Sequence, residues 1–362
     1  MSIRILRQIT KNLQETDFLT VMMDETADCS NQEQVILCLR WVTVDLVVEE
    51  EFVGLYNTAD TSANTLVSIL HDCLLRLNLS VNKLRGQCYD GASSMAGKRN
   101  GVAKQITNLE ERAVYTHCYG HSLNLACCDT IKRIKLLKDA MDITHEITKL
   151  IKQSPRRDSL FRAMKEQLCD KSVGIRILCP TRWTVRADSL NSILENYSIL
   201  LDFWQEAVDI VADSEMKARI LGVSYSMKSF NFLFGICLGH FVLRFSDNLS
   251  RSLQSTHMSA VEGQHIANIT LKQLKALRND ESFDKFWDKV QEKREQFSVG
   301  EAVLPRKRKV PKKLDDGFAP NEFPATTKDL YRQIYFEALD TITSTITDRF
   351  DQPGYQVNTN LH

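Results

Sequence analysis

The 362-residue sequence has no excess of either charge, because 46 Lys and Arg residues balance 46 Asp and Glu residues. The whole molecule therefore has no bulk electrostatic attraction to nucleic acid. Its ten cysteines show no C-x-x-C pair and no regular spacing, and no pattern typical of a secretory signal is present. A disulfide framework is thereby excluded, and we expect a reducing intracellular compartment.

Long hydrophobic runs are also missing. The most apolar stretch, Phe230–Phe245, is about 16 residues long and contains His240 and Arg244. A membrane-spanning helix needs roughly 20 apolar residues. The stretch therefore predicts a buried helix, and we expect no membrane partner.

The charges are unevenly distributed along the chain. Residues 1–130 hold 11 Lys and Arg against 16 Asp and Glu, whereas residues 131–190 hold 14 against 7. An acidic block beside a basic one is consistent with a metal site flanked by a phosphate-binding surface. It is equally consistent with basic helices that have solvated outer faces.

The first 130 residues have an α/β pattern. An apolar run, Phe18–Met23, predicts a buried strand that ends in Asp24. The remaining pattern predicts strands at 35–44, 51–56, 84–89 and 113–118, with helices at 61–79, where Thr61 or Ser62 is the cap, and 101–109. The strand at 84–89 leads directly into Asp90, so acids follow the first and fourth strands.

Residues 131–300 change to an all-helical pattern. Apolar spacing predicts amphipathic helices at 134–151, 190–208, 261–277 and 283–297. A basic loop rich in Pro and Lys follows at 301–326, and a final helix begins the segment 327–362. The fold class is thus α/β plus all-α.

Asp24 and Asp90 are the candidate catalytic and metal-binding residues. Acids at the ends of neighbouring strands can converge, and oxygen ligands suit Mg²⁺ or Mn²⁺. Two such ions promote in-line phosphoryl transfer. The alternative is that each acid caps the turn that follows its strand.

Four motifs carry a resemblance to a known family. They are FLTVMMDETAD at 18–28, GQCYDGASSM at 86–95, THCYGHSLNL at 116–125 and CPTRW at 179–183. In this order they resemble hAT transposases, and more narrowly the domesticated branch that includes zinc finger MYM-type protein 1. The resemblance implies a ribonuclease H-like core, split by a large helical insertion, with a DDE carboxylate triad that cuts and joins DNA.

Asp24 and Asp90 match the first two members of that triad. The third, a glutamate after the insertion, has no match, because neither Glu262 nor Glu337 lies in the family's context. Ser94 replaces an Asn that is frequent in the family. On the resemblance, residues 1–130 are an incomplete first part of the core, the chain is truncated before the dimerisation segment, and a homodimer belongs to a longer parent chain.

Cys118 and His121 form a C-x-x-H pair, which with His117 offers at most part of a zinc site. The resemblance places the pair beside the catalytic acids, where a structural or supporting role is expected. Trp183 is by default a core aromatic. The resemblance instead implies that Trp183 stacks on a flipped base while Arg182 contacts phosphate.

The proline-bounded loop contains a run of basic residues that resembles a nuclear-import signal. The run could also contact phosphate or simply be solvated. Its members are Arg306, Lys307, Arg308, Lys309, Lys312 and Lys313.

Three functions fit the sequence. The first is a nuclear transposase-derived protein that binds DNA or partner proteins without independent catalysis. The second is an active Mg²⁺-dependent enzyme of DDE type for DNA cleavage and strand transfer, and the third is a protein-interaction scaffold that needs no metal.

Overall fold

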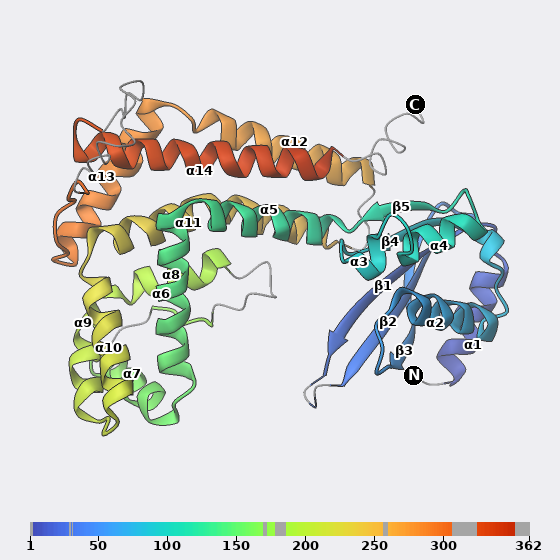
Figure 1. The fold of residues 1–362 in the computed structure, drawn as a ribbon, viewed down its shortest axis with the longest axis horizontal. Helices are drawn as coiled ribbons and strands as arrows, with labels where there is room; N and C mark the ends of the chain where they lie inside the picture. The colour runs from blue at the N-terminus through green and yellow to red at the C-terminus, as the bar shows by residue number, and fades with distance from the viewer. Residues whose placement is uncertain are drawn as a thin grey trace, which may run out of the picture. The chain divides into compact units, whose positions relative to one another are not determined.

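The computed structural model describes residues 3–28, 30, 32–168, 172–177, 186–255, 260–305 and 324–351. The chain divides into two compact units (Figure 1). The sheet unit comprises Met1–Asn124, Ser252–His265 and Asp348–His362, and the helical unit comprises Leu125–Arg251 and Ile266–Thr347.

The sheet unit is built on one five-stranded mixed sheet with the strand order β3-β2-β1-β4-β5. β1 pairs antiparallel with β2, and β2 with β3, whereas β1 pairs parallel with β4, and β4 with β5. Its elements are α1 (Ile3–Gln14), β1 (Leu19–Ala27), β2 (Glu33–Val42), β3 (Val48–Asn57), α2 (Ala63–Arg76), the 3-10 turn η1 (Val81–Lys83), β4 (Leu84–Tyr89), α3 (Ser93–Ala96), α4 (Val102–Leu109) and β5 (Val114–His117).

One face of this sheet carries the core of the unit. In β1, burial alternates along the strand, so that Leu19, Val21 and Met23 are buried. Their partners in β2 are Trp41, Leu39 and Leu37, which are buried on the same face. Buried residues of α1, α2 and α4 join this cluster. The prediction that this strand is buried on both faces is therefore wrong, because Thr20 and Met22 on the other face are only half-buried and Asp24 is exposed.

Most predicted elements of the sheet unit are confirmed. β4 has the predicted bounds, and α2 begins after Ser62, whose hydroxyl accepts a hydrogen bond from the Thr65 amide. The predicted end of the first strand is wrong, because β1 continues past Asp24 to Ala27. It does so because β2 pairs with it as far as Ala27 and Glu33, where the Asp28 carboxylate accepts hydrogen bonds from the turn amides of Ser30 and Gln32.

The helical unit contains most of the remaining helices. α5 begins in the sheet unit and continues into this one. The helices are α5 (Tyr119–Arg133), α6 (Lys135–Lys152), α7 (Pro155–Gln167), α8 (Arg186–Glu195), α9 (Tyr197–Asp209), α10 (Ser214–Met227), α11 (Phe230–Leu253), α12 (Ala260–Ala276), α13 (Asp280–Gln296) and α14 (Thr327–Phe350).

The single helix predicted at 190–208 is wrong, because the structure divides it into α8 and α9 at Asn196. Asn196 is fully buried, and its amide donates to the carbonyls of Val173 and Ser192. The Lys165 ammonium donates to the Asn196 Oδ1 at 2.8 Å. A buried polar side chain needs such partners, and the break supplies them. The spacing of apolar residues carries no information about the hydrogen bonds that a buried side chain needs.

Aromatic side chains form the core where α11, α13 and α14 meet. The Phe234 ring lies 4.6 Å from that of Tyr331 and 5.5 Å from that of Phe286, between ring centroids. Tyr335 contacts Phe286 and Phe283 in the same way. Such pairs add stabilisation beyond the area they bury. The apolar stretch predicted to be a buried helix is therefore the centre of this cluster.

Among the described helices, none has by itself the length and apolar composition needed to cross a membrane. α10 and α11 meet that composition only as a pair, and the pair is bent by 76°.

Two glycines of the helical unit provide a matched test of packing. A Cβ at Gly235 in α11 would lie 2.6 Å from the Ala140 Cβ of α6, whereas a Cβ at Gly222 in α10 would meet nothing within 4 Å. We expect Gly235→Ala to lower the free energy of unfolding by about 1–3 kcal/mol through overpacking. Gly222→Ala should raise it by about 0.5–1 kcal/mol through helix propensity. Chemical denaturation measures both, and equal effects would contradict the close approach of α6 and α11.

Candidate functional site

The two predicted acids lie where neighbouring parallel strands stop pairing. The last residues that pair between β1 and β4 are Met22 and Cys88, and Asp24 and Asp90 each lie two residues further along. Since side chains alternate along a strand, both acids continue the face of Met22 and Cys88. This face is opposite to the one that carries the buried core. The structure therefore brings Asp24 and Asp90 together at one edge of the sheet.

The third parallel strand adds Cys118 to the same edge. β5 pairs with β4 through His117 and Tyr89, and the next residues along are Cys118 and Asp90. The Cys118 amide donates to the Tyr89 carbonyl at 3.0 Å, which continues the pairing beyond the end of the strand. The ends of β1, β4 and β5 thus present two carboxylates and a thiol side by side.

Electrostatics show that these groups interact. Partial burial raises the pKa of Asp24, while the nearby His121 and a hydrogen bond from the Glu25 amide oppose that rise. The negative charges of Asp90 and Cys118 raise the pKa of Asp24 further. The two acids are thus close enough to repel each other, as two carboxylates that share a site do.

Cys118 and His121 form an ion pair beside the acids. A hydrogen bond from the Cys88 thiol and the contact with His121 lower the pKa of Cys118 to about 4. Burial lowers the pKa of His121, but the thiolate of Cys118 and the carboxylates of Asp24 and Asp90 raise it more, so the net shift is upward. These interactions therefore favour the charged forms of both groups, as in thiolate–imidazolium pairs.

Backbone contacts fix the loop that follows β4. The Asp90 Oδ1 accepts a hydrogen bond from the Ala92 amide at 3.0 Å, and the Asp90 carbonyl accepts one from the Tyr115 hydroxyl at 3.0 Å. A Cβ at Gly91 would lie 2.9 Å from the ring of His117, so only glycine fits this approach without a shift. Asp90 therefore also serves the turn, as the alternative interpretation of the sequence expected.

No group of three or more His, Cys, Asp and Glu residues is arranged to hold a metal ion within the part of the chain that the structure describes. Cys118, His121 and His117 therefore do not form a zinc site there. The Asp24 and Asp90 pair has the hard oxygen atoms that Mg²⁺ or Mn²⁺ requires, and Mg²⁺ is usually bound by one or two carboxylates while it keeps several waters. The donor set thus fits one such ion, with no third protein ligand arranged beside the pair in the described ranges.

The sequence analysis missed two residues of the site. Cys88 lies two residues before Asp90, and this spacing on a strand was a sufficient signal that they share a face. Glu25 follows Asp24, and burial together with the charges of Asp90, Glu33 and Asp24 raises its pKa. The Glu25 Oε1 is buried and has no hydrogen-bond partner among the described residues.

The other predicted site residues lie outside the described residues. These are Arg182 and Trp183, together with the basic run formed by Arg306, Lys307, Arg308, Lys309, Lys312 and Lys313. Ser94 is described and lies in α3, the short helix that follows the Asp90 turn.

Comparisons with known proteins agree with the motifs. Residues 1–101 match the family described as ZMYM1/FAM200, RNase-like domain (DUF4371). The chain is 20% identical over 292 residues to the human protein named 52 kDa repressor of the inhibitor of the protein kinase, and 23% identical over 300 residues to its mouse counterpart. Each match covers 78% of this chain and 38% of the relative, so the chain spans well under half of these relatives.

These matches confirm the resemblance predicted from the four motifs: the chain is similar to a domain described as ZMYM1/FAM200, RNase-like, and to the two repressor proteins. The family match covers β1, β2, β3 and β4, and it includes both Asp24 and Asp90.

The ion pair beside the acids leads to a test by titration. In His121→Ala the imidazolium that stabilises the Cys118 thiolate is lost, so we expect the pKa of Cys118 to rise from about 4 by on the order of one unit or more. The ultraviolet absorbance of the thiolate against pH measures it, with Cys118→Ser to assign the signal. His71→Ala, an exposed histidine of α2, is the matched control. An unchanged Cys118 titration in His121→Ala would show that the imidazole has no part in it.

Proposed function

We propose that this chain is a hAT-derived, nucleic-acid-binding protein with a ribonuclease H-like core split by a helical insertion, in which Asp24 and Asp90 hold a divalent cation. The observation that carries this proposal is the position of the two acids on one face, each two residues beyond the last pair that joins the parallel strands β1 and β4. We further propose that the protein acts in the nucleus and does not cut DNA on its own.

Local charge supports the choice of a divalent cation. With both acids ionised, Asp24, Asp90 and the Cys118 thiolate carry three negative charges, and the His121 imidazolium carries one positive charge. These four groups therefore sum to two negative charges, which one Mg²⁺ or Mn²⁺ would neutralise. When bound, such an ion polarises phosphoryl oxygens and lowers the pKa of bound water.

The protein side of the site positions these groups. The Ala92 amide orients the Asp90 carboxylate, and the Glu25 amide orients that of Asp24. His121 limits the repulsion that the thiolate adds beside the acids. Because the described residues include no group of three side chains arranged to hold a metal ion, we propose that a phosphodiester is bound here and is not cleaved.

The basic block at 131–190 is the proposed phosphate-binding surface. Part of its charge is already paired within the protein, since Lys135 contacts Asp139 at 2.5 Å and Lys152 contacts Asp158 at 2.8 Å. Several exposed cations of the block make no ion pair with any described residue. These are Lys132, Arg133, Lys138, Lys149 and Arg156. Such cations are available to displace counterions from a phosphate backbone.

Mn²⁺ binding tests the carboxylate pair. We expect Asp24→Asn and Asp90→Asn each to weaken Mn²⁺ at least about tenfold, which corresponds to a loss of about 1.4 kcal/mol from one charged ligand. Isothermal titration calorimetry measures this affinity. Asp45→Asn is the control, because Asp45 is exposed in the β2–β3 turn, away from the acid pair. A metal competes with protons, so the raised pKa of Asp24 makes affinity fall at a higher pH than an ordinary aspartate would.

Two results would overturn this part of the proposal. Mn²⁺ affinity that is equal in wild type, Asp24→Asn and Asp90→Asn would remove the metal site. Mn²⁺-dependent nicking of a supercoiled plasmid, abolished in both variants, would instead favour the active DDE-type enzyme.

DNA binding tests the basic surface. Lys138 and Lys149 lie 11 residues apart on α6, about three turns, and so share a helix face. We expect Lys138→Gln and Lys149→Gln each to weaken duplex DNA binding uniformly across sequences and to reduce the salt slope by about one. Fluorescence anisotropy at several salt concentrations measures this slope. Lys135→Gln is the matched control, because Lys135 is already paired with Asp139. Absence of DNA binding at low salt would favour the protein-interaction scaffold.

A further inference from the structure

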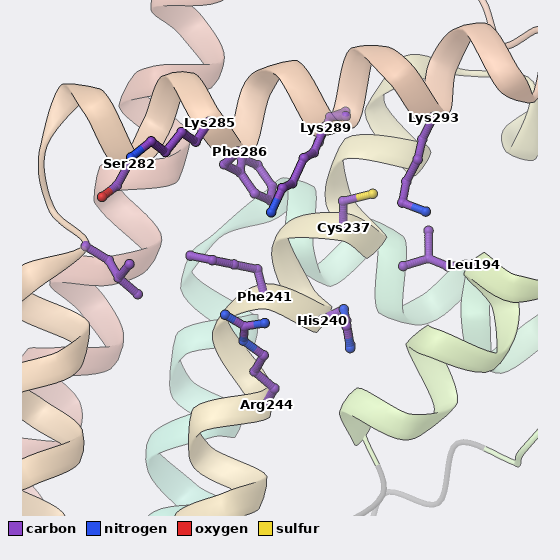
Figure 2. Close-up of a pocket in the computed structure, with 12 residues that line it drawn as sticks. Leu194, Cys237, His240, Phe241, Arg244, Ser282, Lys285, Phe286, Lys289 and Lys293 are labelled. Carbon is purple, nitrogen blue, oxygen red and sulfur yellow. The ribbon is translucent and has the colours of Figure 1, made fainter.

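A cavity of about 270 Å³ lies within the helical unit, between α11 and α13 (Figure 2). Its wall contains His240 and Arg244 from α11, together with Lys289 and Lys293 from α13. Figure 2 shows the side chain of Lys289 directed from its helix toward Phe241, and that of Lys293 directed toward Leu194. The cavity is thus lined with basic groups from two helices.

The basic groups follow the helix repeat. His240 and Arg244 are four residues apart on α11, and Lys289 and Lys293 are four residues apart on α13, so each pair lies on one side of its helix. Like charges at this spacing destabilise a helix, so Lys289 and Lys293 repel each other on α13, and the Arg244 guanidinium of α11 faces the same cavity. A bound anion would relieve this repulsion.

These cations are not engaged by acids of the described chain. Arg244, Lys289 and Lys293 make no ion pair with any residue that the structure describes, whereas Lys285 at the same cavity contacts Glu281 at 2.6 Å. Asp188 and Glu195 raise the pKa of His240, but burial and the positive charges of Arg244 and Lys293 lower it by more. Positive charge from α11 and α13 therefore acts on His240, and the nearby acids do not reverse the direction of its pKa shift.

Part of the cavity wall is apolar. Phe286 is 7% exposed and Val290 is 1% exposed, and both line the cavity with Phe241. The Arg244 guanidinium lies 5.1 Å from the centroid of the Phe241 ring, so this ring is held beneath a cation. The basic groups alone would suffice to bind an inorganic anion. Contact with the apolar wall adds binding free energy only for a ligand that has an apolar or planar body.

We propose that this cavity binds one nucleotide, with its phosphate on Arg244, Lys289 and Lys293 and its base against Phe241 and Phe286. A guanidinium matches the geometry of phosphate oxygens and a lysine acts as a point charge on them. Aromatic side chains accept any base, because every base has a π-face. The volume is near the lower end of ligand pockets, so it suits a single nucleotide, either free or at the 5′ end of a strand.

The test is a titration of the whole chain with adenosine 5′-diphosphate by isothermal titration calorimetry in the absence of divalent metal. We expect saturable binding that is weakened roughly tenfold by Arg244→Gln and by Lys289→Gln, since each removes one charge-assisted contact. Lys272→Gln, an exposed lysine of α12 that does not line the cavity, should leave binding unchanged. Circular dichroism of each variant verifies that it is folded, and Lys293→Gln provides a third variant.

Two smaller probes separate charge from the apolar wall. Adenosine lacks the phosphates and pyrophosphate lacks the base, so each should bind at least about tenfold more weakly than the diphosphate, by the loss of one kind of contact. Equal binding of pyrophosphate and the diphosphate would overturn the proposal, as would a lack of diphosphate binding or an equal loss in Lys272→Gln.

A short oligonucleotide with a 5′-phosphate distinguishes the two sources of the ligand. If it displaces the diphosphate and its unphosphorylated form does not, the cavity holds the end of a strand; if neither displaces it, the ligand is a free nucleotide. Asp24→Asn with Asp90→Asn should leave diphosphate binding intact. Failure of the metal proposal and failure of this one are therefore separately observable.

Discussion

The parallel pairing of β1 with β4, and of β4 with β5, is the constraint on which the site depends. The carboxyl ends of parallel strands meet at the same end of a sheet. If the register continues, two residues that lie equally far beyond the last paired residues of their strands are neighbours. Beyond Met22 and Cys88 this places Asp24 next to Asp90, and beyond Tyr89 and His117 it places Asp90 next to Cys118. A slip of one residue in β4 would turn Asp90 to the buried face and would separate the acids.

Gathering three acidic groups at one edge has an energetic cost, and the neighbouring residues partly offset it. Desolvation and mutual repulsion raise the pKa of Asp24. The pKa of His121 is itself raised by Cys118 and the acids. The positive charge of His121 attracts these negative groups and so offsets part of the cost of bringing them together. The Cys88 thiol stabilises the Cys118 thiolate from the adjacent strand. The motif around Cys118 and His121 is thus a charge-balancing element of the acid site, which a zinc-ligand interpretation of the C-x-x-H spacing does not reveal.

Sequence patterns predicted the sheet unit well because its strands obey local rules. β4 was placed at Leu84–Tyr89 as a short strand that leads into Asp90, and α2 was placed by its apolar spacing and a cap at Thr61 or Ser62, of which the structure uses Ser62. The extension of β1 beyond Asp24 depends on pairing with β2, and the break at Asn196 depends on contacts with Lys165 and Val173. The contacts behind both features are made with residues that are distant in sequence or lie on another element. The local spacing of apolar residues therefore does not predict either feature.

The candidate sites differ in the same way. The acid pair was predictable, because Asp90 follows β4, the apolar part of β1 ends at Asp24, and the resemblance joined the two acids. The cavity between α11 and α13 was not, since His240 and Arg244 first appeared only as interruptions of an apolar run. Their meaning depends on α13, whose Lys289 and Lys293 repeat the same four-residue spacing on the opposite wall. Two basic pairs that look like ordinary solvated charges on separate helices become a site only when the aromatic core of Phe234, Phe286 and Tyr331 packs those helices together. The packing that stabilises the helical unit therefore also brings basic side chains from two helices around a partly apolar cavity.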